Sequence, residues 1–315
     1  MKIEPFTQDR LGEIVSLSER CLPEYRFTEK TWKRCTLEDP NFDPELMLLA
    51  MEEQGLVGLF FACRRLRFPQ PPETERAWLK IFFVEPRHRE RGVASRLLDY
   101  LEQKLASDGI RELRVSDCAS WHFFPGVNIL YDDAVGFLTS RNFVKASEFV
   151  DYLVDLSRFK HPERVVKTKQ MLESQGFTFR LAEARDRGAL IKWVANRFGP
   201  FWSYEVDRSF QKATPTTVIA EKADRTIGFS SWSSLETEWL GPIGVSEEER
   251  RQGVGTVLLF QALSELFWAG LRIAVIPWTS QLFFYTQVPG IVGLRHYWVM
   301  TKQLSQGLGD AHGSR

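Results

Sequence analysis

Hydrophobic and polar positions along the chain follow the same order twice. An apolar run over residues 77–84 precedes a charged turn and then a segment, 93–107, in which apolar residues recur every three or four positions. The run 239–245, another charged turn and the segment 254–269 repeat this order. Such apolar runs are typical of buried strands, and this spacing is typical of a helix with one face in a core. Each set therefore predicts a strand followed by a helix.

A second strand is expected after each of these helices. Gly109 and Gly270 follow the helical segments directly, where glycine favours the left-handed conformation that ends a helix. The next residues read IRELRVSD, with polar and apolar positions alternating, and LRIAVIPW, which is almost wholly apolar. A strand–helix–strand unit of this length brings its two strands into one sheet in parallel. The pattern thus predicts an α/β protein (α+β, with a mixed sheet).

The two sets are copies of one segment. Residues 84–98 read VEPRHRERGVASRLL and residues 245–259 read VSEEERRQGVGTVLL, so Val84 falls on Val245 and Gly92 on Gly253. The number of residues between equivalent positions of the two segments is too large for a solenoid repeat and indicates a duplicated domain. We expect a first domain over 1–157, a linker with a connecting helix over 158–176, a second domain over 177–304 and a flexible tail over 305–315.

Composition narrows the class of protein. Lys and Arg together number 41, as do Asp and Glu, so the net charge of zero argues against a general attraction to nucleic acid or acidic membranes. We expect a cytoplasmic protein, because the N-terminus has no apolar signal core and no uncharged apolar stretch is long enough to span a membrane. The cysteines, whose spacing predicts buried reduced thiols and no metal site, are Cys21, Cys35, Cys63 and Cys118.

Candidate chemistry lies in the turn between each strand and its helix. The first turn and the start of its helix consist of Arg89, Glu90, Arg91, Gly92, Val93, Ala94 and Ser95. The second turn and the start of its helix consist of Arg250, Arg251, Gln252, Gly253, Val254, Gly255 and Thr256. A glycine at a helix N-terminus lets phosphate oxygens approach unpaired N–H groups, and arginines add charge-assisted contacts. Because Gly-Lys-Ser/Thr and G-x-G-x-x-G are both absent, these loops are predicted to bind pyrophosphate in another way.

Both segments resemble the acetyl-CoA-binding segment of the GNAT acyltransferases. The first carries V-x-P-x-x-R-x-x-G-V-A-x-x-L-L, and the second V-x-x-x-x-R-R-Q-G-V-G-x-x-L-L, with Glu247 where the family often has proline. The resemblance implies two GNAT-type domains in tandem, each a splayed mixed β-sheet flanked by helices, and acetyl-CoA as the acyl donor. It places pantetheine against the backbones of Phe83 and Val84 in the first copy and of Ile243, Gly244 and Val245 in the second. The alternative is a glycine turn with an exposed arginine rim.

Catalytic groups are implied by the same resemblance. GNAT enzymes commonly use a tyrosine after the second strand as general acid and a glutamate or an ordered water as base. In the second copy, Tyr285 lies in a segment similar to the family's F-Y-x-x-x-G, although Pro289 stands where the family has glycine. Glu236 and Glu238 lead into the strand that ends at Val245 and are candidate bases. A buried core aromatic and solvated strand-edge charges are the alternative interpretations.

The first copy departs from this pattern. Leu138 falls at the tyrosine position and cannot donate a proton. Tyr131 or His122, in an additional aromatic segment, could replace it, or that segment could be purely structural. We therefore expect the first copy to bind acyl-CoA weakly or structurally, and the chemistry to belong to the second copy.

The resemblance implies an N-acetyltransferase that transfers an acetyl group from acetyl-CoA to an amine, and we expect it to be monomeric or homodimeric. The acceptor is expected to be a small molecule or a peptide, without nucleic acid or membrane partners. Two alternatives belong to other classes: a non-catalytic acyl-CoA-binding or regulatory protein, and a protein that binds a phosphate ligand unrelated to coenzyme A.

Overall fold

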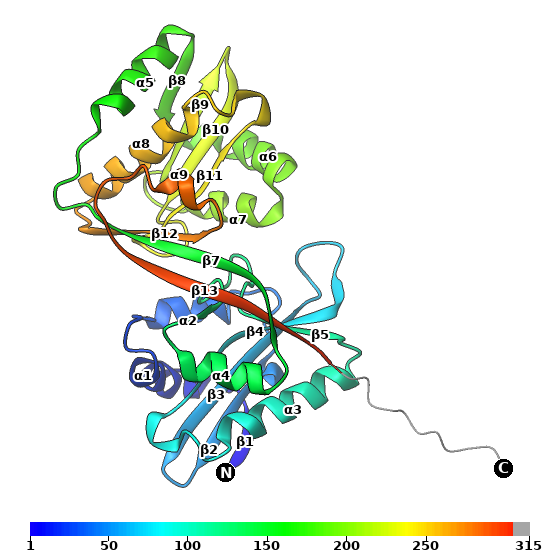
Figure 1. Ribbon diagram of the computed structural model, residues 1–315. Coiled ribbons are helices and arrows are strands. Elements are labelled where there is room, and N and C mark those ends of the chain that lie inside the picture. Colours follow the sequence, from blue (N-terminus) through cyan, green and yellow to red (C-terminus); the bar gives the residue numbers. More distant parts are fainter. Residues whose placement is uncertain (305–315) are drawn as a thin grey trace. The chain divides into compact units, whose positions relative to one another are not determined.

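The computed structural model (Figure 1) describes residues 1–304 and divides into two compact units. The first contains residues 1–149 together with residues 297–304, and the second contains Val150–His296. The predicted tail, 305–315, lies outside the described residues. No helix among residues 1–304 is long and apolar enough to cross a membrane.

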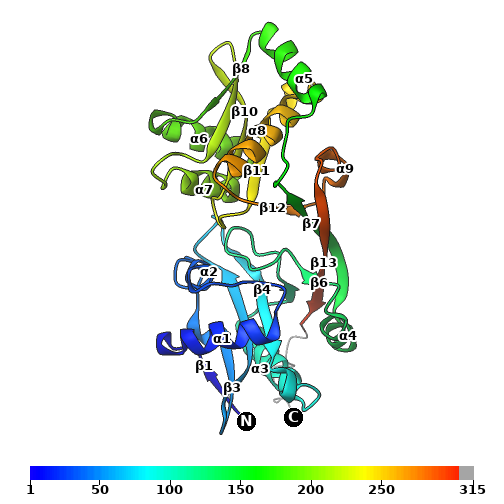
Figure 2. The same ribbon diagram turned by 90° about the vertical axis from the view of Figure 1, so that its left-hand side faces the viewer.

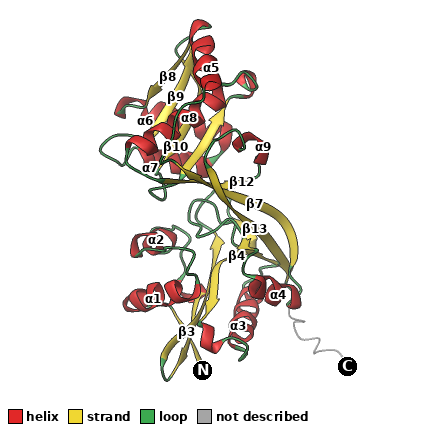
Figure 3. Ribbon diagram, turned by 60° about the vertical axis from the view of Figure 1, so that its left-hand side comes forward, coloured by secondary structure: helices red, strands yellow, loops and turns green. Residues whose placement is uncertain are grey.

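The first unit is a mixed sheet between helices. Its strands are β1 (Lys2–Pro5), β2 (Met47–Glu52), β3 (Gly55–Arg65), β4 (Glu73–Val84), β5 (Glu112–Val115) and the short β6 (Val127–Asn128). Its α-helices are α1 (Leu11–Cys21), α2 (Glu29–Cys35), α3 (Val93–Ser107) and α4 (Asp132–Ser140). Short 3-10 turns cover Gln8–Arg10, Pro44–Leu46 and Pro86–His88. Helices α1 and α2 cover one face of the sheet and α3 and α4 the other (Figure 3).

Strand β3 shows why both faces are covered. Leu59 and Phe61 pack in the core beneath α1 and α2, whereas Phe60 and Ala62 pack in the core beneath α3. All four are buried, because successive side chains of a strand point to opposite faces. A strand that is apolar on both faces must lie between two layers of helices, as parallel and central strands do.

The second unit repeats this plan. Its strands are β8 (Phe177–Leu181), β9 (Thr217–Lys222), β10 (Arg225–Trp232), β11 (Leu240–Val245) and β12 (Ile273–Thr279). Its α-helices are α5 (Glu163–Ser174), α6 (Arg187–Phe198), α7 (Pro200–Ser209), α8 (Val254–Trp268) and α9 (Leu282–Tyr285). Short 3-10 turns cover Ala184–Asp186 and Glu247–Glu249. The antiparallel order is β11-β10-β9-β8, with α5 and α8 on one face and α6 and α7 on the other (Figure 2).

The last strand of each copy is divided between the units. Strand β7 (Val144–Asp155) enters the second unit at Val150, and β13 (Ile291–Gln303) enters the first unit at Tyr297. In the first unit β5 pairs with β13, with Arg114 opposite Thr301. In the second unit β12 pairs with β7, with Ala274 opposite Val154. Each copy's sheet is therefore completed by the other copy's final strand.

The compact units accordingly differ from the predicted division of the chain. The boundary between the units falls within β7, at 149/150, and residues 297–304 belong to the first unit again. Helix α5, which we expected to connect the domains, buries Val165 and Leu172 in the core that α8 also occupies. Strand exchange between copies leaves no trace in local composition, so the sequence pattern did not indicate it.

The α/β architecture and the predicted elements around the two loops are confirmed. The first helix spans Val93–Ser107 as expected, and the second spans Val254–Trp268. Gly109 and Gly270, directly after them, have φ angles of 80° and 85°. These lie in the left-handed region that glycine adopts without steric cost.

Candidate active site

The first pyrophosphate-type loop has the backbone that its sequence predicted. Gly92 begins α3 with φ 77° and ψ 7°, and no side chain in the described chain caps the helix N-terminus. A Cβ atom added to Gly92 would meet no described atom within 4 Å beyond its chain neighbours. The first-turn N–H groups of α3 are therefore open to an approaching ligand, and they carry the partial positive charge of a helix N-terminus.

Arg89 ties this loop to the strand before it. Its Nε donates a hydrogen bond to the carbonyl oxygen of Val84 at 3.3 Å. The rest of the guanidinium is partly exposed, and Nη1 lies 3.9 Å from a carboxylate oxygen of Asp133 on α4. An arginine held at one nitrogen keeps its remaining donors for an anion.

Beside this loop, two parallel strands part. Strand β4 pairs with β5 from Arg76 to Leu79, and the N–H of Ser116 donates to the carbonyl of Leu79 at 2.8 Å. Beyond that point no strand of the described chain pairs with this edge of β4. Unpaired strand edges present N–H and C=O groups to an extended ligand. This is the splay that the resemblance implied.

A cleft of about 890 Å³ occupies the splay. The predicted binding residues that line it are Phe83, Val84, Arg89, Glu90, Gly92, Val93, Ala94 and Ser95. Arg91, predicted with them, is exposed and does not line it. The opposite wall comes from α4 and the segment before it. The volume is in the range of small-molecule and cofactor sites. A role of these residues in binding stays a prediction.

The other end of the cleft carries groups that can exchange protons. The Tyr131 hydroxyl donates a short hydrogen bond to the Glu24 carboxylate, and both side chains line the cleft. Glu24 lies between α1 and α2, outside every motif in the sequence, so the sequence analysis missed it. Cys21 also lines the cleft, but burial raises the pKa of its thiol to about 11. At neutral pH it is protonated and therefore a poor nucleophile.

Buried polar contacts hold this wall in place. The Asn128 amide donates to the Tyr25 hydroxyl at 2.6 Å, and the Tyr25 and Tyr297 hydroxyls lie 3.1 Å apart. Tyr297 belongs to β13, so the chain's final strand supports the cleft of the first unit. A satisfied buried network of this kind fixes the position of a loop.

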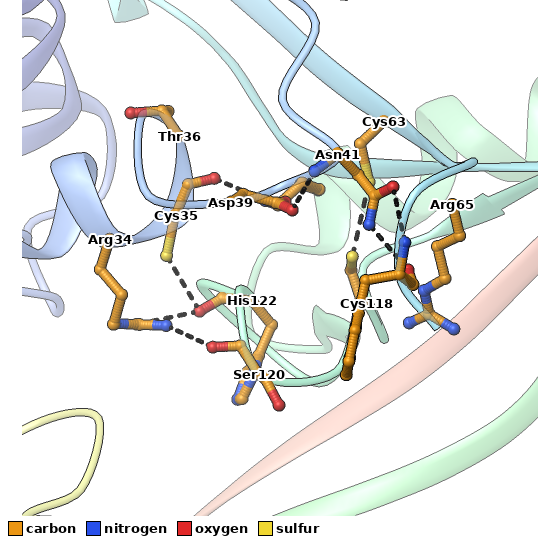
Figure 4. A network of polar contacts seen from close by, with 12 residues as sticks. Arg34, Cys35, Thr36, Asp39, Asn41, Cys63, Arg65, Cys118, Ser120 and His122 are labelled. Atoms are coloured by element: carbon orange, nitrogen blue, oxygen red, sulfur yellow. Dashed lines mark hydrogen bonds and ion pairs between the residues drawn. The ribbon is translucent and has the colours of Figure 1, made fainter. Parts of the chain in front are cut away.

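Two other candidates in the first copy have structural positions. Leu138, at the family's tyrosine position, is fully buried in the core beneath α3. His122 is buried away from the cleft, and its carbonyl accepts hydrogen bonds from the Arg34 guanidinium and the Cys35 thiol (Figure 4). Burial and the charge of Arg34 hold the pKa of His122 well below its ordinary value, so its ring is neutral at pH 7.

The second loop has nearly the same backbone. Gly253 begins α8 with φ 98° and ψ −2°, and Arg250 Nε donates to the carbonyl of Val245 at 3.2 Å, as Arg89 does to Val84. Strands β11 and β12 also part, after a single parallel bridge between Trp239 and Val275. The duplicated sequence thus produces a duplicated loop.

Unlike the first loop, the second is covered by the chain itself. A Cβ atom on Gly253 would lie 2.5 Å from the methyl group of Thr168 on α5. A Cβ atom on Gly255 would lie 3.5 Å from the ring of Phe284 on α9. Thr256, two residues inside the helix, donates to the Gln287 side chain at 3.0 Å. Side chains of α5 and α9 therefore lie against the start of this helix, where those of the first copy do not.

The predicted catalytic residues of the second copy differ in burial: Tyr285 is buried, whereas Glu236 and Glu238 are half-buried. Tyr285 is 8% exposed, its ring packs against Tyr152 and Phe284, and burial raises its pKa. Glu236 and Glu238 are half-buried, and their backbone carbonyls accept hydrogen bonds from Trp239 and Val275.

On β11, the predicted binding residues of the second copy are also packed. A Cβ atom on Gly244 would lie 2.7 Å from the ring of Phe198. Ile243 and Val245 pack against the core that contains α8. The structure thus brings the predicted residues of the second copy close to the loop, but among packed side chains. Their catalytic and binding roles stay a prediction.

All four cysteines are buried and none of them forms a disulfide, as the spacing predicted. Cys63 and Cys118 lie with their sulfur atoms 3.4 Å apart, a juxtaposition that the sequence did not indicate.

Comparison with known proteins agrees with this geometry. Residues 11–125 match the model of the acetyltransferase (GNAT) family. A comparison with curated proteins gives no match. The whole chain is similar to the GCN5-related glucosamine N-acetyltransferase region of a fungal multi-domain GH3 β-N-acetylglucosaminidase (TM-score 0.77, 17% identity, 96% of this chain). The chain spans only 38% of that protein.

Two further solved structures match over nearly their full length. One is a GCN5-related N-acetyltransferase from Sphaerobacter thermophilus, with TM-score 0.69, 15% identity and coverage of 98% of this chain and 96% of that one. The other is a tandem GNAT protein from the clavulanic acid biosynthesis pathway, with TM-score 0.65, 13% identity and coverage of 98% and 99%. Identities this low show the fold. The chain thus has a tandem GNAT-type fold, and residues 11–125 of its first copy match the family's model.

Proposed function

We propose that the protein is an N-acetyltransferase that uses acetyl-CoA to acetylate an amine of a small molecule or a peptide, and that the reaction takes place in the first copy. The observation that supports this site is the open cleft between β4 and β5, which ends at the uncovered N-terminus of α3. This assignment reverses the sequence-based expectation, which gave the chemistry to the second copy.

Each part of the first cleft has a role in this proposal. The amides at the start of α3, with Arg89, would bind the pyrophosphate. The free edge of β4 from Lys80 to Val84 would hydrogen-bond to the extended pantetheine. Acetyl-CoA would supply the acyl group. Because Cys21 is protonated, the acyl group would pass directly to the amine without an acyl-enzyme intermediate.

Glu24 and Tyr131 are the groups that we assign to proton transfer. The carboxylate would accept the proton of the attacking amine, and the phenol hydroxyl would hold that carboxylate in place and provide a proton near the leaving sulfur. We further propose a cytoplasmic location, which four buried cysteines outside any disulfide support.

The donor site is tested with matched arginine variants. Arg89→Glu and Arg250→Glu each remove an arginine that makes the same hydrogen bond to the preceding strand. Losing a charge-assisted contact and adding a repulsive charge should weaken acetyl-CoA binding by Arg89→Glu about tenfold to a hundredfold in calorimetry. Arg250→Glu should bind as the unchanged protein does. The reverse result would return the site to the second copy.

The reaction is tested by thiol release from acetyl-CoA with a panel of amines. Glu24→Gln and Tyr131→Phe should lower kcat by about a hundredfold or more, the range of general acid–base groups, with the Kd for acetyl-CoA unchanged. The same change at Tyr285 should leave kcat unaltered. A loss of turnover confined to Tyr285→Phe would refute the assignment of protons to the first copy.

Leu138 favours a second candidate function. A copy with leucine at the family's tyrosine position, fully buried, could bind acyl-CoA without catalysing transfer. Tight acetyl-CoA binding with no thiol release on any amine would establish this regulatory or binding role in place of the enzyme.

A further inference from the structure

Two thiols meet in the first unit, outside the lining of the cleft that we assign to acetyl transfer. Cys63 lies on β3, and Cys118 lies in the loop that follows β5. Their sulfur atoms are 3.4 Å apart (Figure 4). Both residues are almost fully buried beside Trp78. The proposed reaction uses neither of them.

Charged groups surround this pair. The Lys80 ammonium, fully buried, is 2.7 Å from the Asp39 carboxylate. The Arg65 guanidinium stacks 4.0 Å above the Trp78 ring and interacts with both thiols. Two cations beside two thiols favour the thiolate form of one of them, which is the reactive form.

A metal site is the first alternative for this cluster. An Asp39 oxygen and the two sulfur atoms all lie within 4.8 Å of one another. However, the carboxylate is already paired with Lys80, so a metal ion would have to displace a buried ammonium and lie close to a second cation. The charges therefore favour a dithiol pair over a metal site.

The two thiols are not equivalent. The hydrogen bond with Cys63 and the charges of Lys80 and Arg65 lower the pKa of Cys118 to about 7, although burial opposes them. The same hydrogen bond and burial raise the pKa of Cys63. Cys118 is thus the nucleophile of the pair and Cys63 the partner that resolves it.

We propose that Cys63 and Cys118 form a reversible disulfide when a hydroperoxide oxidises the protein. The Cys118 thiolate attacks one oxygen of hydrogen peroxide, the O–O bond breaks and a sulfenic acid forms on Cys118. The leaving hydroxide takes up the proton that the Cys118 thiol had released and becomes the first water. The Cys63 sulfur then attacks the Cys118 sulfur, the S–S bond forms and water leaves. In total two thiols lose two electrons, and one hydrogen peroxide becomes two waters. The sulfur atoms must approach from 3.4 Å to about 2.05 Å.

Movement of Cys118 can supply this approach. Cys63 is fixed by the ladder between β3 and β4, opposite Trp78, whereas Cys118 belongs to no helix or strand. The same loop continues to the residues that line the cleft wall, which are Phe124, Gly126, Val127, Asn128 and Tyr131. A disulfide would therefore tie the start of the cleft wall to the central sheet.

The test is a peroxide titration of the whole protein without any ligand. After alkylation of free thiols, mass spectrometry should identify a cross-linked peptide pair containing Cys63 and Cys118, which dithiothreitol reverses. Cys21 and Cys35 should not be oxidised, so both should be found alkylated. Hydrogen exchange over residues 116–131 should slow in the oxidised protein, because the loop is held at one more point.

Matched variants separate the outcomes. Cys35→Ser should still form the cross-link, since its thiol instead contacts the carbonyl of His122. Cys63→Ser should not form it, and Cys118 should then accumulate sulfenic or sulfinic acid. Full alkylation of both cysteines after peroxide treatment would overturn the proposal, as would a cross-link to Cys21 or Cys35. If the protein instead binds one equivalent of zinc and peroxide produces no cross-link, the cluster is a metal site.

Discussion

The two pyrophosphate-type loops have almost the same backbone and opposite surroundings. Gly92 and Gly253 both begin a helix in the left-handed region, and Arg89 and Arg250 make matching hydrogen bonds to the strand before. Nevertheless, the first glycine is open, whereas the second lies against Thr168. A local geometry that both copies share therefore does not establish a binding site, because the neighbouring elements decide whether a ligand can reach it.

The difference between the copies arises outside the loops. In the first copy α4 spans Asp132–Ser140 and forms one wall of a cleft. In the second the corresponding helix, α9, has shortened to Leu282–Tyr285, and the ring of Phe284 packs on Gly255. If one copy is enough for catalysis, side chains of the other copy can pack where a ligand would otherwise bind. This packing adds buried apolar area.

The largest expected difference between the copies concerns β4. Its Lys80 is buried and paired with Asp39, whereas the equivalent position in the second copy is Gly241. Lys80→Met leaves a buried carboxylate without its cation and should lower the free energy of unfolding of the first unit by about 3–5 kcal/mol. Urea denaturation measures this loss. Adding Asp39→Asn should restore part of it, and an unchanged midpoint for Lys80→Met would contradict the buried ion pair.

Alanine at the two loop glycines compares their surroundings directly. Gly92→Ala and Gly253→Ala each place a side chain at positive φ, at a cost of roughly 1–2 kcal/mol. Only Gly253→Ala also meets the Thr168 methyl group, which should add about 1–3 kcal/mol of overpacking. The midpoints of urea denaturation give the two values. Thr168→Ala should remove the excess, and equal costs at both positions would mean that the second loop is not covered.

A pH effect separates the histidines of the two units. His122 is buried and neutral in the folded first unit, with its pKa held well below the ordinary value by burial and then by Arg34. Below about pH 6.5 the unfolded chain binds a proton there that the folded unit does not, so stability falls as pH falls. The loss is at most about 1.4 kcal/mol per pH unit.

Urea denaturation between pH 7.5 and 5 measures this slope. His122→Gln should flatten it. The pKa of His161 in the second unit is also lowered by partial burial, but less than that of His122, so His161→Gln should flatten the slope less. A slope that persists in His122→Gln would assign the pH dependence to other groups.

The smallest expected effect is the recovery of binding by the second loop. Removing its cover with Thr168→Ala and Phe284→Ala should add a weak second equivalent of acetyl-CoA, at least about tenfold weaker than the first, which is 1.4 kcal/mol or more. Calorimetry gives the stoichiometry. Adding Arg250→Glu should abolish the second equivalent, and two equivalents in the unchanged protein would remove the distinction between the copies.

The sequence predicted the local elements well. Helix α3 spans the predicted residues, because the recurrence of Leu97, Leu101 and Leu105 is a property of a helix surface. The loop backbones and the parting of β4 from β5 followed from the motif. Glu24 and the Cys63–Cys118 pair could not be found in this way. Their partners are distant in the sequence, and no local spacing encodes such contacts.

The chain's pattern of apolar residues, glycines and arginines by itself determined two copies of a strand–loop–helix unit in an α/β fold, because backbone conformation depends on near neighbours. Tertiary structure alone decided that the two copies exchange their last strands, that Thr168 and Phe284 cover one loop, and that the other opens into a cleft. These outcomes depend on how α5, α9 and β13 pack against residues far away in the chain. Packing is a property of the assembled core, and a local sequence motif does not determine it.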